Sequence, residues 1–151
     1  MNDQTHHQGS CFCGDVQFTL SSHPELMAYC HCDSCRHWSA GPVSAFTLWK
    51  PDNIKITRGK DNIASFDKNP GINDTTINSN RKWCKTCGGH LFTDHPAMGL
   101  VDVPAAVIKG LNFKPAFHVH YQESVQPIKD GLPKFKELPA EAGGSGEMLA
   151  E

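Results

Sequence analysis

The amino-acid sequence predicts a mainly β fold, built from several short antiparallel strands with little helix. Thirteen glycines and ten prolines divide the 151 residues into short runs rich in β-forming side chains. No long stretch keeps the 3.6-residue apolar period of an amphipathic helix. The length suits one ordinary domain, and the 38% apolar and 20% charged content is typical of a packed globular chain.

The clearest strand prediction covers residues 15–20, where polar and apolar side chains alternate. Val16, Phe18 and Leu20 would share one buried face of such a strand, because side chains two apart point the same way. Most of the other predicted strands are bounded by turn residues, and they cover residues 43–49, 54–57, 63–66, 76–79, 91–93, 105–108 and 117–121.

One short helix is predicted over residues 33–39, with Asp33 or Ser34 as its N-cap. Residues 1–8 are polar and predicted to be flexible, and residues 139–151 have the Gly/Ser/Glu-rich composition of a mobile tail. We therefore expect a single folded domain over residues 9–138.

The charge and the apolar content narrow the classes of partner. A net charge of -2 gives no electrostatic reason to bind nucleic acid or an anionic membrane surface. No apolar run approaches the roughly 20 residues of a membrane helix, and the polar N-terminus does not resemble a signal peptide. We expect a soluble cytoplasmic protein that binds small molecules, and the sequence does not indicate its oligomeric state.

Seven cysteines form three groups: a C-x-C pair, a C-x-C-x-x-C triplet and a C-x-x-C pair, at positions 11 and 13, at 30, 32 and 35, and at 84 and 87. An odd number of cysteines in a chain expected to be cytoplasmic is poorly explained by disulfides. Metal binding explains the spacing better, and zinc is the metal that such sets usually hold.

Structural zinc takes four ligands, whereas reactive zinc keeps three protein ligands and an open position, so seven thiolates divide naturally into four plus three. The contiguous triplet Cys30, Cys32 and Cys35 fills one open site. The two pairs then close a second site, formed by Cys11, Cys13, Cys84 and Cys87. Two Zn²⁺ ions per chain are therefore predicted.

Local features refine these two sites. An extended strand would let Cys11 and Cys13 face one metal. Gly88 and Gly89 after Cys87 permit the positive φ and the close N–H approach of a zinc knuckle. The open site could instead be a second structural site completed by His31, His37 or another group. His118 and His120, which flank Val119, are expected on the solvent side of a strand and not as metal ligands.

Three segments together resemble the glutathione-dependent formaldehyde-activating enzyme (Gfa) family: Gly9-Ser10-Cys11-Phe12-Cys13, Cys30-His31-Cys32-Asp33-Ser34-Cys35-Arg36 and Arg81-Lys82-Trp83-Cys84-Lys85-Thr86-Cys87-Gly88. The segment Asp130-Gly131-Leu132-Pro133-Lys134-Phe135 also looks like the C-terminal end of the family. Trp83 stands where Phe is frequent, and Val125 stands where many members carry Trp, which bears on substrate choice.

The resemblance implies a β-tent-like zinc fold in which Cys11, Cys13, Cys84 and Cys87 hold structural zinc and Cys30, Cys32 and Cys35 hold catalytic zinc. It also implies carbon-sulfur lyase chemistry, in which glutathione adds to formaldehyde to give S-hydroxymethylglutathione. The fold and the metals transfer more securely than the substrate.

A zinc ion bound by three thiolates is a weak Lewis acid but a good partner for a fourth sulfur ligand. A substrate thiol bound there would lose its proton at neutral pH and become a nucleophile. Positive charge for a carboxylate-bearing thiol such as glutathione, or a proton for the oxygen of its adduct with a small aldehyde, could come from Lys82, Arg81, Arg36 or His31.

Three other classes of protein compete with this interpretation. In a structural or interaction module, both zinc ions would only stabilise the fold. A thiol-redox enzyme similar to the zinc-containing methionine sulfoxide reductases needs a cysteine outside the metal clusters, and none of the seven is spare. A nucleic-acid-binding zinc ribbon needs a basic face, which the acidic balance does not predict.

Overall fold

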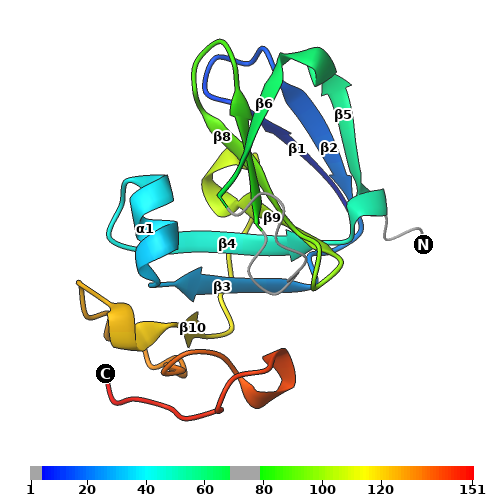
Figure 1. Ribbon diagram of the computed structural model, residues 1–151. Coiled ribbons are helices and arrows are strands. Elements are labelled where there is room, and N and C mark those ends of the chain that lie inside the picture. Colours follow the sequence, from blue (N-terminus) through cyan, green and yellow to red (C-terminus); the bar gives the residue numbers. More distant parts are fainter. Residues whose placement is uncertain (1–4, 69–78) are drawn as a thin grey trace. The chain divides into compact units, whose positions relative to one another are not determined.

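The computed structural model describes residues 5–68 and 79–151 (Figure 1). The described residues form ten strands in two sheets and one α-helix, α1 (Asp33–Ser39), which confirms the predicted mainly β fold. The strands are β1 (His6–Ser10), β2 (Gln17–Ser21), β3 (Leu26–Cys30), β4 (Ser44–Trp49), β5 (Ile54–Arg58), β6 (Ile63–Asp67), β7 (Asn80–Cys84), β8 (His90–His95), β9 (Leu100–Pro104) and β10 (His118–Val119). Short 3-10 helices lie at Pro51–Asn53, Lys60–Asn62, Ala105–Val107, Tyr121–Glu123 and Ala140–Ala142.

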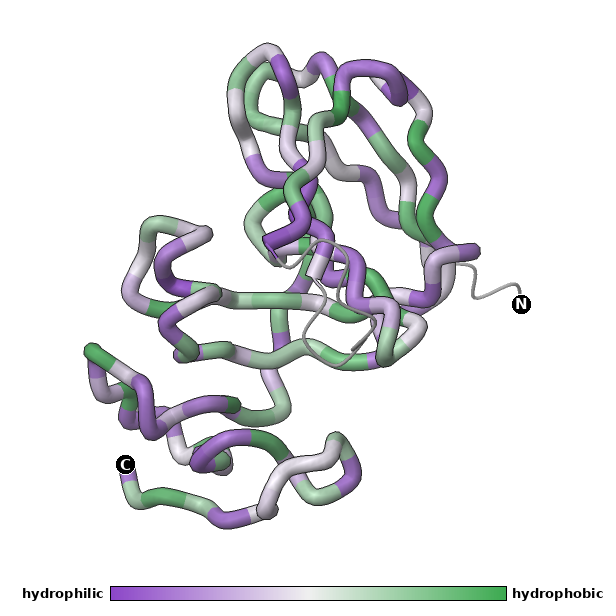
Figure 2. Tube along the Cα trace, in the orientation of Figure 1, coloured by the Kyte–Doolittle hydropathy of each residue, from purple (hydrophilic) through white to green (hydrophobic). Residues whose placement is uncertain are grey.

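The chain folds into two compact units, each made of two separate stretches of sequence. The first unit comprises Met1–Glu25 and Thr47–Asn112, and the second comprises Leu26–Phe46 and Phe113–Glu151. Strand β4 begins in the second unit and ends in the first. Within residues 5–68 and 79–151, no helix is both long enough and apolar enough to span a membrane. Figure 2 shows that the apolar residues form short stretches separated by polar ones.

The first unit contains two antiparallel arrangements of strands. Strand β2 lies between β1 and β5 in a three-stranded sheet, and β6, β7, β8 and β9 pair in sequence order. The alternation predicted for residues 15–20 is confirmed, because Val16, Phe18 and Leu20 are all buried. The Phe18 ring packs edge-on against Phe92, with centroids 4.9 Å apart.

The buried polar groups of Thr47 and Trp49 in this unit are hydrogen-bonded. The Thr47 hydroxyl donates to the carbonyl of Val103 at 2.6 Å and accepts from the Trp49 indole N–H at 2.7 Å. Both Thr47 and Trp49 are fully buried. This chain of hydrogen bonds lets the last residues of β4 enter the core without an unsatisfied polar atom.

The second unit is smaller and less regular. Strand β3 pairs in parallel with β10, an exception to the expected antiparallel pairing. Helix α1 follows β3 after two residues and has the predicted bounds. Its N-cap is Cys32 and not the expected Asp33 or Ser34, because the Cys32 sulfur accepts a hydrogen bond from the backbone N–H of Cys35 at 3.2 Å.

The structure confirms most of the predicted strands with small shifts in their bounds. Residues 43–49, 54–57, 63–66 and 91–93 fall in β4, β5, β6 and β8, and the predicted strand 117–121 is reduced to β10. The prediction for 105–108 is wrong: Ala105–Val107 form a 3-10 turn, closed by the N–H of Ile108 bonding to the carbonyl of Ala105. The prediction for 76–79 lies outside the described residues except for Ser79, which is not in a strand.

Both terminal segments make backbone hydrogen bonds. Residues 6–10 form β1, which pairs with β2. In the C-terminal segment, the N–H of Lys136 donates to the carbonyl of Glu147, and the N–H of Leu149 donates to the carbonyl of Lys134, both at 2.8 Å. The flexibility of residues 1–8 and 139–151, and the domain bounds 9–138, stay predictions.

Candidate metal centres

The first unit brings Cys11, Cys13, Cys84 and Cys87 together, with all four sulfur atoms within 4.8 Å of one another. The sulfurs of Cys11 and Cys13 are 3.6 Å apart, and those of Cys13 and Cys84 are 3.8 Å apart. Cys84 ends β7, and Cys87 lies in the turn before β8. Four soft donors at this spacing could hold one metal ion, and they match the tetrahedral ligand set of structural zinc.

Turns place three of the four sulfurs and a strand end places that of Cys84, so the expectation that Cys11 and Cys13 share an extended strand is wrong. Both residues follow β1 in a turn. The N–H of Val16 donates to the Cys11 sulfur at 3.3 Å, and the N–H of Gly89 donates to the Cys87 sulfur at 3.3 Å. Gly88 has a φ of 75°, as the predicted zinc knuckle requires.

The second unit brings together the remaining three cysteines. Cys30 ends β3, Cys32 caps α1 and Cys35 lies in its first turn, so a strand end and a helix start position the three sulfurs within 4.8 Å of one another. Cys30 is buried, whereas Cys32 and Cys35 are partly exposed. Among the described residues, this group contains three cysteines and no histidine. It offers a metal ion three protein ligands.

The three thiols of the triplet influence one another's ionisation. Hydrogen bonds from Cys30 and Cys35 lower the pKa of Cys32 to about 2. The same interactions with Cys32 and Cys35 raise the pKa of Cys30 far above the usual thiol range. One thiolate is therefore favoured and further ones are opposed, because like charges that lie close together repel one another.

The cationic residues proposed near the open site differ in their surroundings. Arg36 donates from Nε to the carbonyl of His31 at 2.9 Å, and one of its terminal nitrogens lies 3.6 Å from a carboxylate oxygen of Asp33. Lys82, in β7 of the first unit, pairs with Asp94 at 2.8 Å. Arg81 is the neighbour of Lys82 in the same strand. Of these three cations, Arg36 lies in the same unit as the triplet and directly follows Cys35 in the sequence, whereas Arg81 and Lys82 lie in the first unit.

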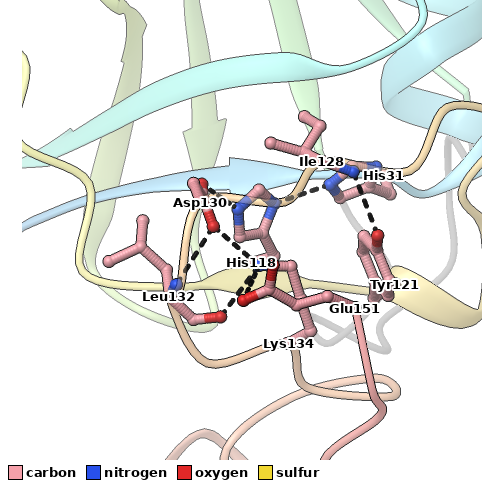
Figure 3. A network of polar contacts seen from close by, with 8 residues as sticks. All are labelled: His31, His118, Tyr121, Ile128, Asp130, Leu132, Lys134 and Glu151. Atoms are coloured by element: carbon pink, nitrogen blue, oxygen red, sulfur yellow. Dashed lines mark hydrogen bonds and ion pairs between the residues drawn. The ribbon is translucent and has the colours of Figure 1, made fainter.

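The expectation that His118 faces solvent is wrong. His118 and His31 are both fully buried, and their rings meet with His31 Nε2 2.8 Å from His118 Nδ1. The other His118 nitrogen, Nε2, lies 2.7 Å from Oδ2 of Asp130 (Figure 3). Burial lowers the pKa of His31 to about 4, so its imidazole is neutral at physiological pH.

A buried lysine completes this polar network. Lys134 donates to Oδ1 of Asp130 at 2.6 Å and to the carbonyl of Leu132 at 2.9 Å. Although partial burial opposes ionisation of Asp130, hydrogen bonds from Lys134 and His118 lower the pKa of this carboxyl below its usual range. Sequence reasoning gave no role to His118, Asp130 or Lys134. The only signal was the segment 130–135, which carries part of the family resemblance.

A mainly β fold with two cysteine groups that could hold metal ions defines the class of the protein. Residues 6–123 match the model of the family described as glutathione-dependent formaldehyde-activating enzyme, which covers more than half of the chain. The chain belongs to this family, as the resemblance predicted.

Individual relatives agree with this assignment. The chain is 26% identical to a candidate glutathione-dependent formaldehyde-activating enzyme of Halomonas elongata, over 95% of this chain and 92% of that protein. It is 24% identical to an uncharacterized lyase of Schizosaccharomyces pombe, and this match spans 57% of the chain but only 56% of the yeast protein. A crystal structure of a Rhodobacter sphaeroides protein has a similar fold, with a TM-score of 0.52, 20% identity, and coverage of 70% of this chain and 90% of that chain.

Proposed function

We propose that the protein is a zinc-dependent enzyme with carbon-sulfur lyase activity, which forms or cleaves the adduct of a small thiol with a small aldehyde. Glutathione and formaldehyde are the substrates that the family description suggests. The observation that carries the proposal is the group of Cys30, Cys32 and Cys35, which offers three protein ligands and leaves the fourth position of a tetrahedral ion to a substrate.

The donor atoms of both groups fit zinc. All seven are sulfur, the soft ligand type that selects Zn²⁺ over Mg²⁺ or Ca²⁺. In this proposal, Cys11, Cys13, Cys84 and Cys87 hold a structural ion in the first unit. Cys30, Cys32 and Cys35 hold the ion at which the thiol binds, so each chain carries two.

Zinc bound by the triplet would supply one function, the lowering of the pKa of a bound thiol. In the synthetic direction, a bond forms between sulfur and the carbonyl carbon, the carbon-oxygen π bond breaks, and the proton lost by the thiol ends on the oxygen. The cysteines contribute by fixing the position of the thiol, because a bound geometry replaces a chance encounter. Arg36 carries positive charge on α1, directly after Cys35 in the sequence, and could attract a substrate carboxylate.

Cobalt substitution tests thiol binding, because the visible spectrum of Co²⁺ responds to sulfur coordination. Glutathione should change the spectrum of the protein loaded with Co²⁺ at the triplet, whereas S-methylglutathione, which has no free thiol, should not. Exchange NMR with added formaldehyde should then show adduct formation above the uncatalysed rate.

An unchanged cobalt spectrum together with a background exchange rate in fully metallated protein would contradict the assignment to glutathione and formaldehyde. That pair of results would favour the alternative in which both metal ions only stabilise the fold. A spectral change without rate enhancement would identify a thiol-binding protein that is not an enzyme for this aldehyde.

A further inference from the structure

A line of three hydrogen-bonded groups in the second unit, two buried histidines and a partly exposed aspartate, carries no role in the proposed chemistry. Asp130, His118 and His31 are joined end to end, with distances of 2.7 Å from Asp130 Oδ2 to His118 Nε2 and 2.8 Å from His118 Nδ1 to His31 Nε2 (Figure 3). Both imidazole rings are fully buried. Each of the two hydrogen bonds has one donor and one acceptor. The positions of the protons can therefore be derived step by step, beginning at the carboxylate of Asp130.

When it is ionised, the carboxylate of Asp130 can only accept hydrogen bonds. Asp130 Oδ1 accepts from Lys134 Nζ at 2.6 Å and from the backbone N–H of Leu132 at 3.0 Å. Lys134 thus faces two carboxylates, Asp130 at 2.6 Å and Glu151 at 3.6 Å, and the neutral form of the fully buried His118 ring has a smaller desolvation cost than the charged form. A neutral His118 donates from Nε2 to Asp130 Oδ2, so its Nδ1 carries a lone pair.

The tautomer of His118 determines which nitrogen of His31 carries the proton. Because His118 Nδ1 is an acceptor, the proton between the two rings belongs to Nε2 of His31. The remaining nitrogen of His31, Nδ1, then carries a lone pair. This atom is buried and has no hydrogen-bond partner among the described residues. The His31 ring is held in place by the ring of Tyr121, edge-on with centroids 4.9 Å apart.

We propose that Asp130, acting through His118, holds His31 in the Nε2–H tautomer, and that Nδ1 of His31 is a buried binding point for one hydroxyl group. A buried acceptor without a donor is costly, so a hydroxyl is expected there. Water and a hydroxyl-bearing substrate offer the same chemistry. Asp130 and His118 are positioning residues in this arrangement.

Because His31 lies within the cysteine triplet, a substrate bound there is one source of the hydroxyl group. His31 lies between Cys30 and Cys32, and its backbone is bound on both sides, with its N–H donating to the carbonyl of Val119 and its carbonyl accepting from Arg36. The product of thiol addition to an aldehyde carries one hydroxyl. This part of the inference rests on the proposed function, whereas the tautomer of His31 does not.

Two-bond ¹H–¹⁵N correlation NMR of the zinc-loaded full chain measures the tautomer directly, with His31→Gln to assign the signals. We expect protonated Nε2 and unprotonated Nδ1 for both His31 and His118. A spectrum in which Nδ1 of His31 carries the proton would overturn the proposal. The unaltered protein alone decides this point, without thiol or aldehyde.

Asp130→Asn tests the positioning role. The two donors at Oδ1 require an oxygen there, so the amide nitrogen of Asn would face His118 and donate to its Nε2. His118 would then be protonated on Nδ1, and His31 would become protonated on Nδ1 as well. Glu123→Gln is the matched control, because Glu123 accepts from the N–H of Asp33 and approaches His120, whereas the hydrogen bonds of His118 in the described part of the chain go to Asp130 and His31. A folded Asp130→Asn protein with unchanged tautomers would contradict the relay.

The source of the hydroxyl is determined by cross-relaxation between water and the carbon-bound proton next to Nδ1 of His31. A water signal that persists when S-hydroxymethylglutathione is added identifies a structural water. Loss of that signal with a shift of the Nδ1 resonance identifies the substrate hydroxyl. Absence of a water signal, with no change on addition of the adduct, would show that no hydroxyl binds and would overturn the proposal.

Discussion

At the scale of single residues, the second unit contains a lysine that is only 1% exposed. Lys134 lies between the carboxylates of Asp130, at 2.6 Å, and Glu151, at 3.6 Å. A charge removed from water in this way is tolerated because its partners are fixed around it. Its loss would leave Asp130 without its shortest hydrogen bond.

Lys134→Met should lower the free energy of unfolding by about 2 kcal/mol, because the change removes a buried cation that donates a charge-assisted hydrogen bond to the partly exposed carboxylate of Asp130. Urea unfolding of the zinc-loaded protein at neutral pH measures this loss. Lys136→Met is the matched control: Lys136 pairs with Glu147 at 3.3 Å, but both side chains are exposed, so its loss should cost less than ~1 kcal/mol. Equal losses for the two variants would contradict the role given to burial.

At the scale of elements, turns, strand ends and the start of α1 place the cysteine sulfurs. Cys84 closes β7 and is fully buried, and its cluster ties the turn after β1 to the turn between β7 and β8. The triplet joins only β3 to the adjacent α1. A metal that joins distant segments constrains more of the unfolded chain than one that joins neighbours.

Cys84→Ser should therefore abolish cooperative unfolding or lower the thermal midpoint by on the order of 10 °C or more. Cys35→Ser should lower it by less than about 5 °C, because its site is local. Circular dichroism melts of both variants, expressed with the same zinc supply, compare them. Equal damage would mean that the two sites do not differ as structural and open, and the noncatalytic alternative would gain support.

At the scale of the whole molecule, each compact unit contains one of the two cysteine groups. We expect close to two zinc ions per chain by elemental analysis, and removal by a chelator in two steps, with the three-ligand site losing its ion first. Cys30→Ser should reduce the zinc content to about one ion per chain. A folded protein that contains no zinc would contradict the metal assignment at both sites.

Local sequence patterns predicted the strands in which polar and apolar side chains alternate. Residues 15–20 alternate, and the bounds of α1 follow from a polar start and the break after Ser39. Strand β3 was not predicted, since Leu26–Cys30 has little alternation and is held between β4 and residues 118 and 119 of β10. Such pairing depends on residues about 90 positions away, which no local pattern reports.

The sequence by itself determined the two cysteine groups, because metal ligands occur at characteristic spacings and thiols have few other reasons to cluster. It also determined the mainly β class and the family. Only the tertiary structure decided that His118 is buried, that Lys134 is a core residue and that Asp130, His118 and His31 form a line. His31 and His118 are 87 positions apart, and their contact exists only because β10 pairs with β3. Burial and hydrogen-bond direction are properties of such long-range pairing, so a sequence pattern that is read locally cannot contain them.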